Sequence, residues 1–160
     1  MFEELSQHIL DIAMNSLSAN AKKVQISILE SRTRDWLILR VRDDGHGMDA
    51  ATLKQVLSCR WSSKKKRRKP VGLGLALLQQ TSEMCDGHFH VRSVPGRGTS
   101  VTASMRLSHI DRPPLGDLNT TILALCATDK KMDVQLNYRS DEQKFSFDSR
   151  ELTTKKKVIL

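Results

Sequence analysis

The sequence predicts an α/β fold, a two-layer sandwich in which helices cover a mixed, largely antiparallel sheet. Two pairs of segments, 23–29 with 36–42 and 88–94 with 99–107, alternate like half-buried strands joined by short turns. One segment with helical periodicity, residues 5–21, precedes the first pair. Another precedes the second pair and ends at Met84. Because each pair forms a hairpin with no helix between its strands, the sheet is expected to be mainly antiparallel.

The first helix, residues 5–21, carries two distinct faces. An apolar stripe at helical spacing consists of Leu5, Ile9, Ile12, Ala13 and Leu17. A polar row on another face consists of His8, Asp11, Asn15 and Ser18. A carboxylate and an amide one turn apart on a half-buried helix need polar partners, and a divalent cation with a nucleotide phosphate would supply them. A solvated outer face would carry the same residues, so this helix alone leaves both interpretations open.

Two glycine-containing segments stand at the ends of predicted elements. Asp43 ends the second strand and is followed by Gly45 and Gly47, which suggests positive φ or close approach of a flat ligand to the backbone. An ordinary Asp-Gly turn would have the same sequence. Gly72 and Gly74 open the helix that ends at Met84, where backbone N–H groups can face an anion. A glycine pair also permits tight packing, so each segment by itself has an alternative.

Between the hairpins, a short helix at residues 50–57 precedes a loop at residues 58–71 that contains the basic run 64–69. The run can be a solvated loop, a clamp on phosphates or a contact to nucleic acid. Non-specific nucleic-acid binding would need a broader basic face with stacking aromatic residues, and aromatic residues make up only 4% of the chain. We therefore do not expect nucleic acid to be the primary partner.

Composition is that of an ordinary globular domain, with 160 residues, 39% apolar residues and a net charge of +8. The three cysteines form no Cys-x-x-Cys pair, which favours a reducing compartment. The sequence shows neither a secretory signal nor an apolar run of about 18 residues that could span a membrane. The chain is therefore expected to be cytoplasmic, without a membrane partner.

Four signals follow one another along the chain: Asp11 with Asn15, Asp43-x-Gly45-x-Gly47, Gly72-x-Gly74, and Gly96-x-Gly98-Thr99. This ordered set resembles the nucleotide-binding domain of the GHKL, or Bergerat-fold, ATPase superfamily, which includes gyrase B, heat-shock-90 chaperones, sensor histidine kinases and MutL. The stretch DIAMNSLSANAKKVQISI is especially similar to the N box of MutL and of small stand-alone bacterial members. The resemblance covers residues 5–107 and implies that the chain binds ATP.

The resemblance also implies roles for individual residues. Asn15 matches the asparagine that ligates Mg²⁺, and Asp43 matches the carboxylate that accepts a hydrogen bond from the adenine amino group. The loop at residues 58–71 matches the lid over ATP. Other matched positions are expected to contact the nucleotide: Gly45, Gly47, Met48, Lys69, Gly72, Leu73, Gly74 and Thr99.

One position departs from the hydrolytic members of the superfamily, which hold a glutamate four residues before the asparagine. This chain has Asp11 there, one methylene shorter, and a water that it activates as general base must lie closer. The resemblance implies slow ATP hydrolysis coupled to lid closure and partner interaction. Two alternatives stay open: a protein kinase that transfers the γ-phosphate to a serine or histidine of a partner, and a non-hydrolysing interaction module that reports nucleotide state.

Residues 1–107 are expected to form the ATP-binding domain, and residues 108–160 an extension that packs on it and is too small to be independent. The extension begins with a proline-rich connector at 108–117 and continues as a helix at 118–127 and a hairpin of segments 133–139 and 144–148. We expect it to meet a protein partner, whose identity, like the oligomeric state, the sequence does not give.

Overall fold

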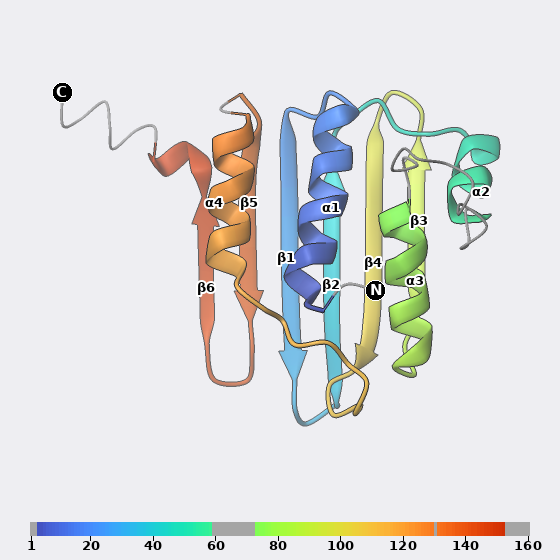
Figure 1. The fold of residues 1–160 in the computed structure, drawn as a ribbon. Helices are drawn as coiled ribbons and strands as arrows, with labels where there is room; N and C mark the ends of the chain where they lie inside the picture. The colour runs from blue at the N-terminus through green and yellow to red at the C-terminus, as the bar shows by residue number, and fades with distance from the viewer. Residues whose placement is uncertain (1–2, 59–72, 130, 153–160) are drawn as a thin grey trace.

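The computed structural model describes residues 3–58, 73–129 and 131–152. Figure 1 shows one sheet with helices in front of it. The elements in chain order are α1 (Leu5–Ser18), β1 (Lys23–Ser31), β2 (Trp36–Asp43), α2 (Ala50–Ser58), α3 (Leu73–Met84), β3 (Phe89–Val94), β4 (Gly98–Arg106), α4 (Leu118–Thr128), β5 (Asp133–Arg139) and β6 (Lys144–Asp148).

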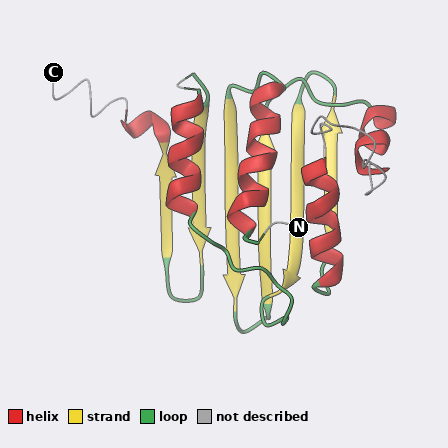
Figure 2. Ribbon diagram, viewed as in Figure 1, coloured by secondary structure: helices red, strands yellow, loops and turns green. Residues whose placement is uncertain are grey.

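The sheet has six strands in the order β3-β4-β2-β1-β5-β6. Every pairing is antiparallel except that of β1 with β5. Helices α1, α3 and α4 lie on one face, whereas no described element covers the other face (Figures 1 and 2). The fold class predicted from the sequence, a helix-covered and largely antiparallel sheet, is confirmed.

The core lies between this sheet and its helices, and strand alternation supplies one side of it. On β2, Leu37, Leu39 and Val41 are buried, while the residues between them point to the uncovered face. Helix α1 supplies Leu5 and Ile9, both fully buried, on the opposite side. Truncating such side chains typically costs about 2–5 kcal/mol, so the placement of α1 over the strands is strongly fixed.

Helix α1 is shorter than the sequence predicts, because it ends at Ser18 rather than at residue 21. Asn20 adopts a left-handed conformation with φ of 59°, and the Ala21 N–H donates to the Ser16 carbonyl across the turn. This is a common way to end a helix, and asparagine tolerates it better than most residues. The chain then enters β1 directly.

The predicted polar row on α1 is wrong at one position, because His8 is fully buried against the core. Burial disfavours the charged imidazolium and lowers the pKa of His8 to about 4. His8 is therefore neutral at pH 7 and belongs to the packed face of the helix. Because its side chain has no exposed surface, it is not placed to accept a phosphoryl group from ATP.

The neutral buried histidine predicts acid sensitivity. The unfolded chain binds a proton at His8 near pH 6.5, whereas the folded chain resists protonation down to about pH 4. Lowering the pH from 7 to 4.5 should therefore reduce the free energy of unfolding by roughly 2–3 kcal/mol through this residue. Urea unfolding of the wild type and of His8→Leu at both pH values measures it. Equal losses in the two proteins would exclude this contribution.

The C-terminal segments continue the same sheet and core. Strand β5 pairs in parallel with β1, so that Val134 lies beside Val24 and Leu136 lies beside Ile26. All four side chains are buried in the core cluster. The connector also holds the start of α1, since the Pro114 carbonyl accepts from the Leu5 N–H at 2.9 Å. The arrangement gives residues 108–148 a structural role around α1 and β1.

Candidate functional site

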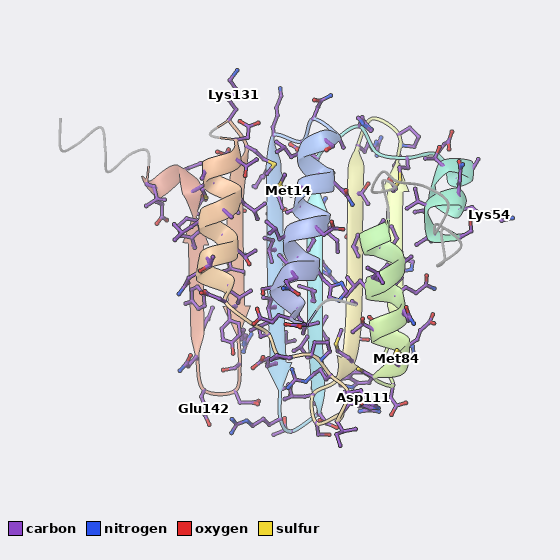
Figure 3. The ribbon with its side chains drawn as sticks, viewed as in Figure 1. Met14, Lys54, Met84, Asp111, Lys131 and Glu142 are labelled. Carbon is purple, nitrogen blue, oxygen red and sulfur yellow. The ribbon has the colours of Figure 1, made fainter. Side chains whose placement is uncertain are left out.

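A cavity of about 300 Å³ opens between α1, α2 and the start of α3, over the ends of β2 and β4. Its walls are mostly apolar, with a few polar side chains, and its lining is Ile12, Asn15, Ser16, Ser18, Ala19, Asp43, His46, Gly47, Met48, Thr52, Val56, Leu75, Thr99 and Val101. Apolar walls with few polar groups are typical of small-molecule sites. Met84 ends α3 at the end of the helix opposite this cavity (Figure 3).

Asp43 is the carboxylate of the cavity, half-buried at the end of β2. The Ser16 hydroxyl donates to its Oδ2 at 2.6 Å, and the backbone N–H groups of Gly45 and Thr99 donate to Oδ1 at 2.9 and 3.3 Å. Donors from three different segments therefore fix the carboxylate in one orientation. Each carboxylate oxygen has more than one acceptor position, so a carboxylate held in this way can accept a further hydrogen bond from a ligand.

The neighbouring Asp44 contacts the backbone rather than the cavity. It is exposed, and its Oδ1 accepts from the backbone N–H groups of Lys22 and Lys23 at 2.8 and 3.0 Å. These two hydrogen bonds connect the end of β2 to the start of β1. Asp44 is not among the cavity residues, in agreement with the one-residue offset from Asp43.

Gly47 brings the backbone of the cavity rim against the β3–β4 turn. Its φ is 68°, and a Cβ at this position would lie only 2.7 Å from the carbonyl carbon of Val94. The next residue, Met48, donates its N–H to the Ser93 hydroxyl at 2.7 Å, and that hydroxyl lies 2.8 Å from the Thr99 hydroxyl. A side chain at residue 47 would push these segments apart and change the cavity wall.

Asp11 and Asn15 are both half-buried on α1, one turn apart, and Asn15 lines the cavity. A Cβ at Gly74 would overlap the Asp11 carboxylate, so glycine at this point lets the carboxylate approach the first turn of α3. A carboxylate near a helix N-terminus is electrostatically favourable, because the exposed N–H groups carry partial positive charge. The structure thus brings Asp11, Asn15 and Gly74 to one side of the cavity.

The other positions matched by sequence are placed as follows. Gly45, Gly47, Met48 and Thr99 surround Asp43 or line the cavity with it. Leu73 begins α3, and Ser58, the first residue of the predicted lid, ends α2. Lys69, Gly72 and the lid from residue 59 onward lie outside the described residues. Asp49 accepts from the Thr52 N–H at 2.7 Å and caps α2.

Sequence reasoning missed Ser16 and Ser93, and for His46 it favoured a position without contact to a ligand. Ser16 is buried at a core-facing position of α1, and Ser93 supports the backbone of Met48. His46 lines the cavity, although it stands at the variable position between the two glycines. A polar residue at a core-facing helical position was the available signal for Ser16, since such a side chain needs a buried partner.

Residues 1–109 match the family described as "Histidine kinase-, DNA gyrase B-, and HSP90-like ATPase". The chain belongs to this family. Among curated relatives, it is 30% identical over 90 residues to sensor histidine kinase YvrG of Bacillus subtilis. The matched region covers 55% of the chain and 16% of that kinase. It is 29% identical over 96 residues to sporulation kinase C of the same organism, covering 60% of the chain and 22% of that kinase.

Solved structures share the fold of this family member. The ATPase domain of Aquifex aeolicus MutL complexed with ADP matches 92% of the chain and 64% of that structure, with a TM-score of 0.51 and 16% identity. The N-terminal domain of a DNA repair protein matches 92% of the chain and 52% of its own length, with a TM-score of 0.59 and 12% identity. The chain thus spans only part of the proteins that it matches. Within its described part, no helix is both long and apolar enough to cross a membrane.

Proposed function

We propose that the cavity binds Mg-ATP and that the protein hydrolyses it slowly in the cytoplasm, coupling lid closure to association with a protein partner. Asp43 carries this proposal, because its carboxylate is held at an apolar cavity by three hydrogen bonds. An adenine ring matches such walls, and its amino group supplies the donor that an oriented carboxylate accepts. The family of the chain and the ADP bound to the MutL domain support the same ligand.

The phosphates would lie toward Asn15 and the start of α3. Gly74 lies in the first turn of α3, against the Asp11 carboxylate, and helix N-termini bind phosphate through backbone N–H groups and the helix dipole. The Asn15 side chain offers an amide oxygen at the cavity, a ligand that suits Mg²⁺ when phosphates and waters complete its coordination. Bound Mg²⁺ would neutralise phosphate charge. Asn15 would orient the phosphates relative to the neighbouring carboxylate.

Asp11 is the proposed general base. It stands one turn from Asn15 and beside Gly74, so its carboxylate is close to where the terminal phosphate would lie. From there it can take a proton from a water that attacks the γ-phosphate. A short aspartate restricts the positions from which that water can react, which is why we propose slow turnover.

A second candidate function is phosphoryl transfer, which the kinase names of the relatives support. ATP labelled at the γ-phosphate, incubated with the full chain and Mg²⁺, tests both candidates. Release of free labelled phosphate supports hydrolysis. ATP that is bound but intact excludes self-sufficient hydrolysis, and label that appears on an added partner protein establishes the kinase alternative.

Ser16 predicts a measurable effect on nucleotide affinity. Its hydroxyl bonds Asp43 at 2.6 Å, so Ser16→Ala removes one of the groups that orient the carboxylate. We expect ATP affinity to fall by about fivefold to tenfold, the equivalent of one hydrogen bond of about 1–1.5 kcal/mol. Calorimetric titration measures it, with Ser82→Ala on α3 as the matched control, because the Ser82 hydroxyl donates to the Leu78 carbonyl and Ser82 does not line the cavity. An equal loss in both variants would contradict the role of Ser16.

A further inference from the structure

The uncovered face of the sheet carries a dense group of basic side chains over β2, β4 and β3. We define this basic sheet face by its exposed arginine and histidine side chains and the hydroxyl side chains between them: Arg40, Arg42, His90, Arg92, Ser100 and Thr102. All lie on the side of the sheet opposite α1 and α3, since they alternate with the core residues of the same strands. The sequence alone does not reveal this face, because its residues come from three separate strands.

Strand register arranges these side chains in two rows across the sheet. Ser100 on β4 lies between Arg42 on β2 and Arg92 on β3. Thr102 lies in the same way between Arg40 and His90. Neighbouring strands are about 4.8 Å apart, so in each row the backbone positions of the two basic residues are about 10 Å apart, with the hydroxyl residue between them.

Within the described part of the chain, no carboxylate forms an ion pair with this face. The ion pairs found among the described residues are Arg32–Glu142, His109–Asp86 and Arg150–Asp148, and none lies on the basic sheet face. Arg40 donates only to the Thr102 hydroxyl, at 3.2 Å. One carboxylate, Asp44, stands two residues beyond Arg42, and its Oδ1 accepts from the backbone N–H groups of Lys22 and Lys23. Asp133 and Asp148, on the same side of the sheet, lie on the more distant strands β5 and β6.

We propose that the basic sheet face binds single-stranded nucleic acid through its phosphate backbone. Guanidinium and hydroxyl groups are the side chains that most often contact phosphate oxygens, and this face offers both in alternation. The exposed imidazole of His90 and the planar guanidinium groups provide surfaces on which unpaired bases stack, which a duplex would keep inside its helix.

A protein partner fits this face less well. Protein interfaces are usually centred on buried apolar or aromatic anchors, and the six residues of the basic sheet face include none. The nearby aromatic residue Trp36 lies farther along β2, outside the basic sheet face, and already has neighbours within the chain. The Arg106 guanidinium carbon lies 4.0 Å from its ring centroid, and the His88 ring centroid lies 6.2 Å from it. The proposal departs from the expectation based on composition, because the fold assembles the broad basic face that the sequence pattern lacks.

Fluorescence anisotropy of a labelled 20-nucleotide single-stranded DNA, titrated with the full chain, tests this proposal. Arg40→Glu/Arg92→Glu should weaken binding at least about tenfold at moderate salt and lower the slope of log K against log salt by about 1.4, as two phosphate contacts are lost. The matched control is Arg34→Glu/Lys131→Glu, which makes the same charge change at exposed positions off this face. The basic run 64–69 is unchanged in both proteins.

The outcomes are distinct. A large loss in the first variant with near wild-type binding in the control supports the proposal. Equal losses in both would overturn it, because bulk charge or another segment would then account for binding. Tighter binding of poly-glutamate than of the DNA at equal charge would also overturn it and indicate an acidic protein partner. Circular dichroism and ATP titration of each variant establish that its fold and nucleotide cavity are intact, so that a loss reports the face itself.

Discussion

Replacing Asp43 with asparagine is expected to weaken ATP binding by about tenfold to a hundredfold. The carboxylate is the acceptor proposed for the adenine amino group, and a hydrogen bond to a charged group contributes roughly 1.5–3 kcal/mol. An asparagine amide would also place a donor against the Ser16 hydroxyl or the N–H groups of Gly45 and Thr99. Calorimetric titration with Mg-ATP measures the change.

The adjacent carboxylate provides a matched control. Asp44→Asn removes the same charge one residue away, but Asp44 is exposed and contacts only the backbone at Lys22 and Lys23. Its variant should bind ATP within about twofold of the wild type, since surface charges have small effects. If Asp43→Asn binds ATP as tightly as Asp44→Asn does, Asp43 is not the adenine acceptor.

The second large effect is expected on turnover. Asp11→Asn should reduce ATP hydrolysis by about a hundredfold or more, because a positioned general base typically contributes 10²–10⁴ to the rate. ATP affinity should be retained or rise, since the variant removes a negative charge beside the start of α3, where the phosphates would lie. Release of labelled phosphate under single-turnover conditions separates the chemical step from binding.

Two results would contradict the role of Asp11. Hydrolysis by Asp11→Asn at the wild-type rate would mean that another group activates water. Loss of ATP binding together with loss of hydrolysis would instead assign Asp11 a structural role, since it packs against Gly74. Asp86→Asn, at an exposed position at the end of α3 away from the cavity, is the control for a general effect of charge removal.

Local patterns in the sequence were sufficient to predict most elements of the fold. Strand alternation and helical periodicity depend on neighbouring residues. The predicted strands begin where β1 and β2 begin and end only one or two residues before them. The parallel pairing of β1 with β5 could not be predicted in this way. Gln25 bonds Gln135 across 110 residues of sequence, and no local pattern encodes such a pairing.

The candidate site shows the same division between local and distant information. Asp43 and Gly47 stand in a short motif, so the sequence marks them directly. Ser16 acts through a residue 27 positions away, and only the fold brings its hydroxyl within 2.6 Å of Asp43. His8 was assigned to the wrong face because the helix buries a wider arc than the apolar stripe suggests.

The most direct test of the central claim is a calorimetric titration of the full chain with ATP in the presence of Mg²⁺. The account predicts saturable binding of one ATP per chain, abolished or strongly weakened in Asp43→Asn and preserved in Asp44→Asn. GTP should bind more weakly, because guanine presents a carbonyl where adenine presents its amino donor. Absence of saturable binding, or equal affinity for ATP and GTP that is unaffected by Asp43→Asn, would contradict an adenine nucleotide site in this cavity.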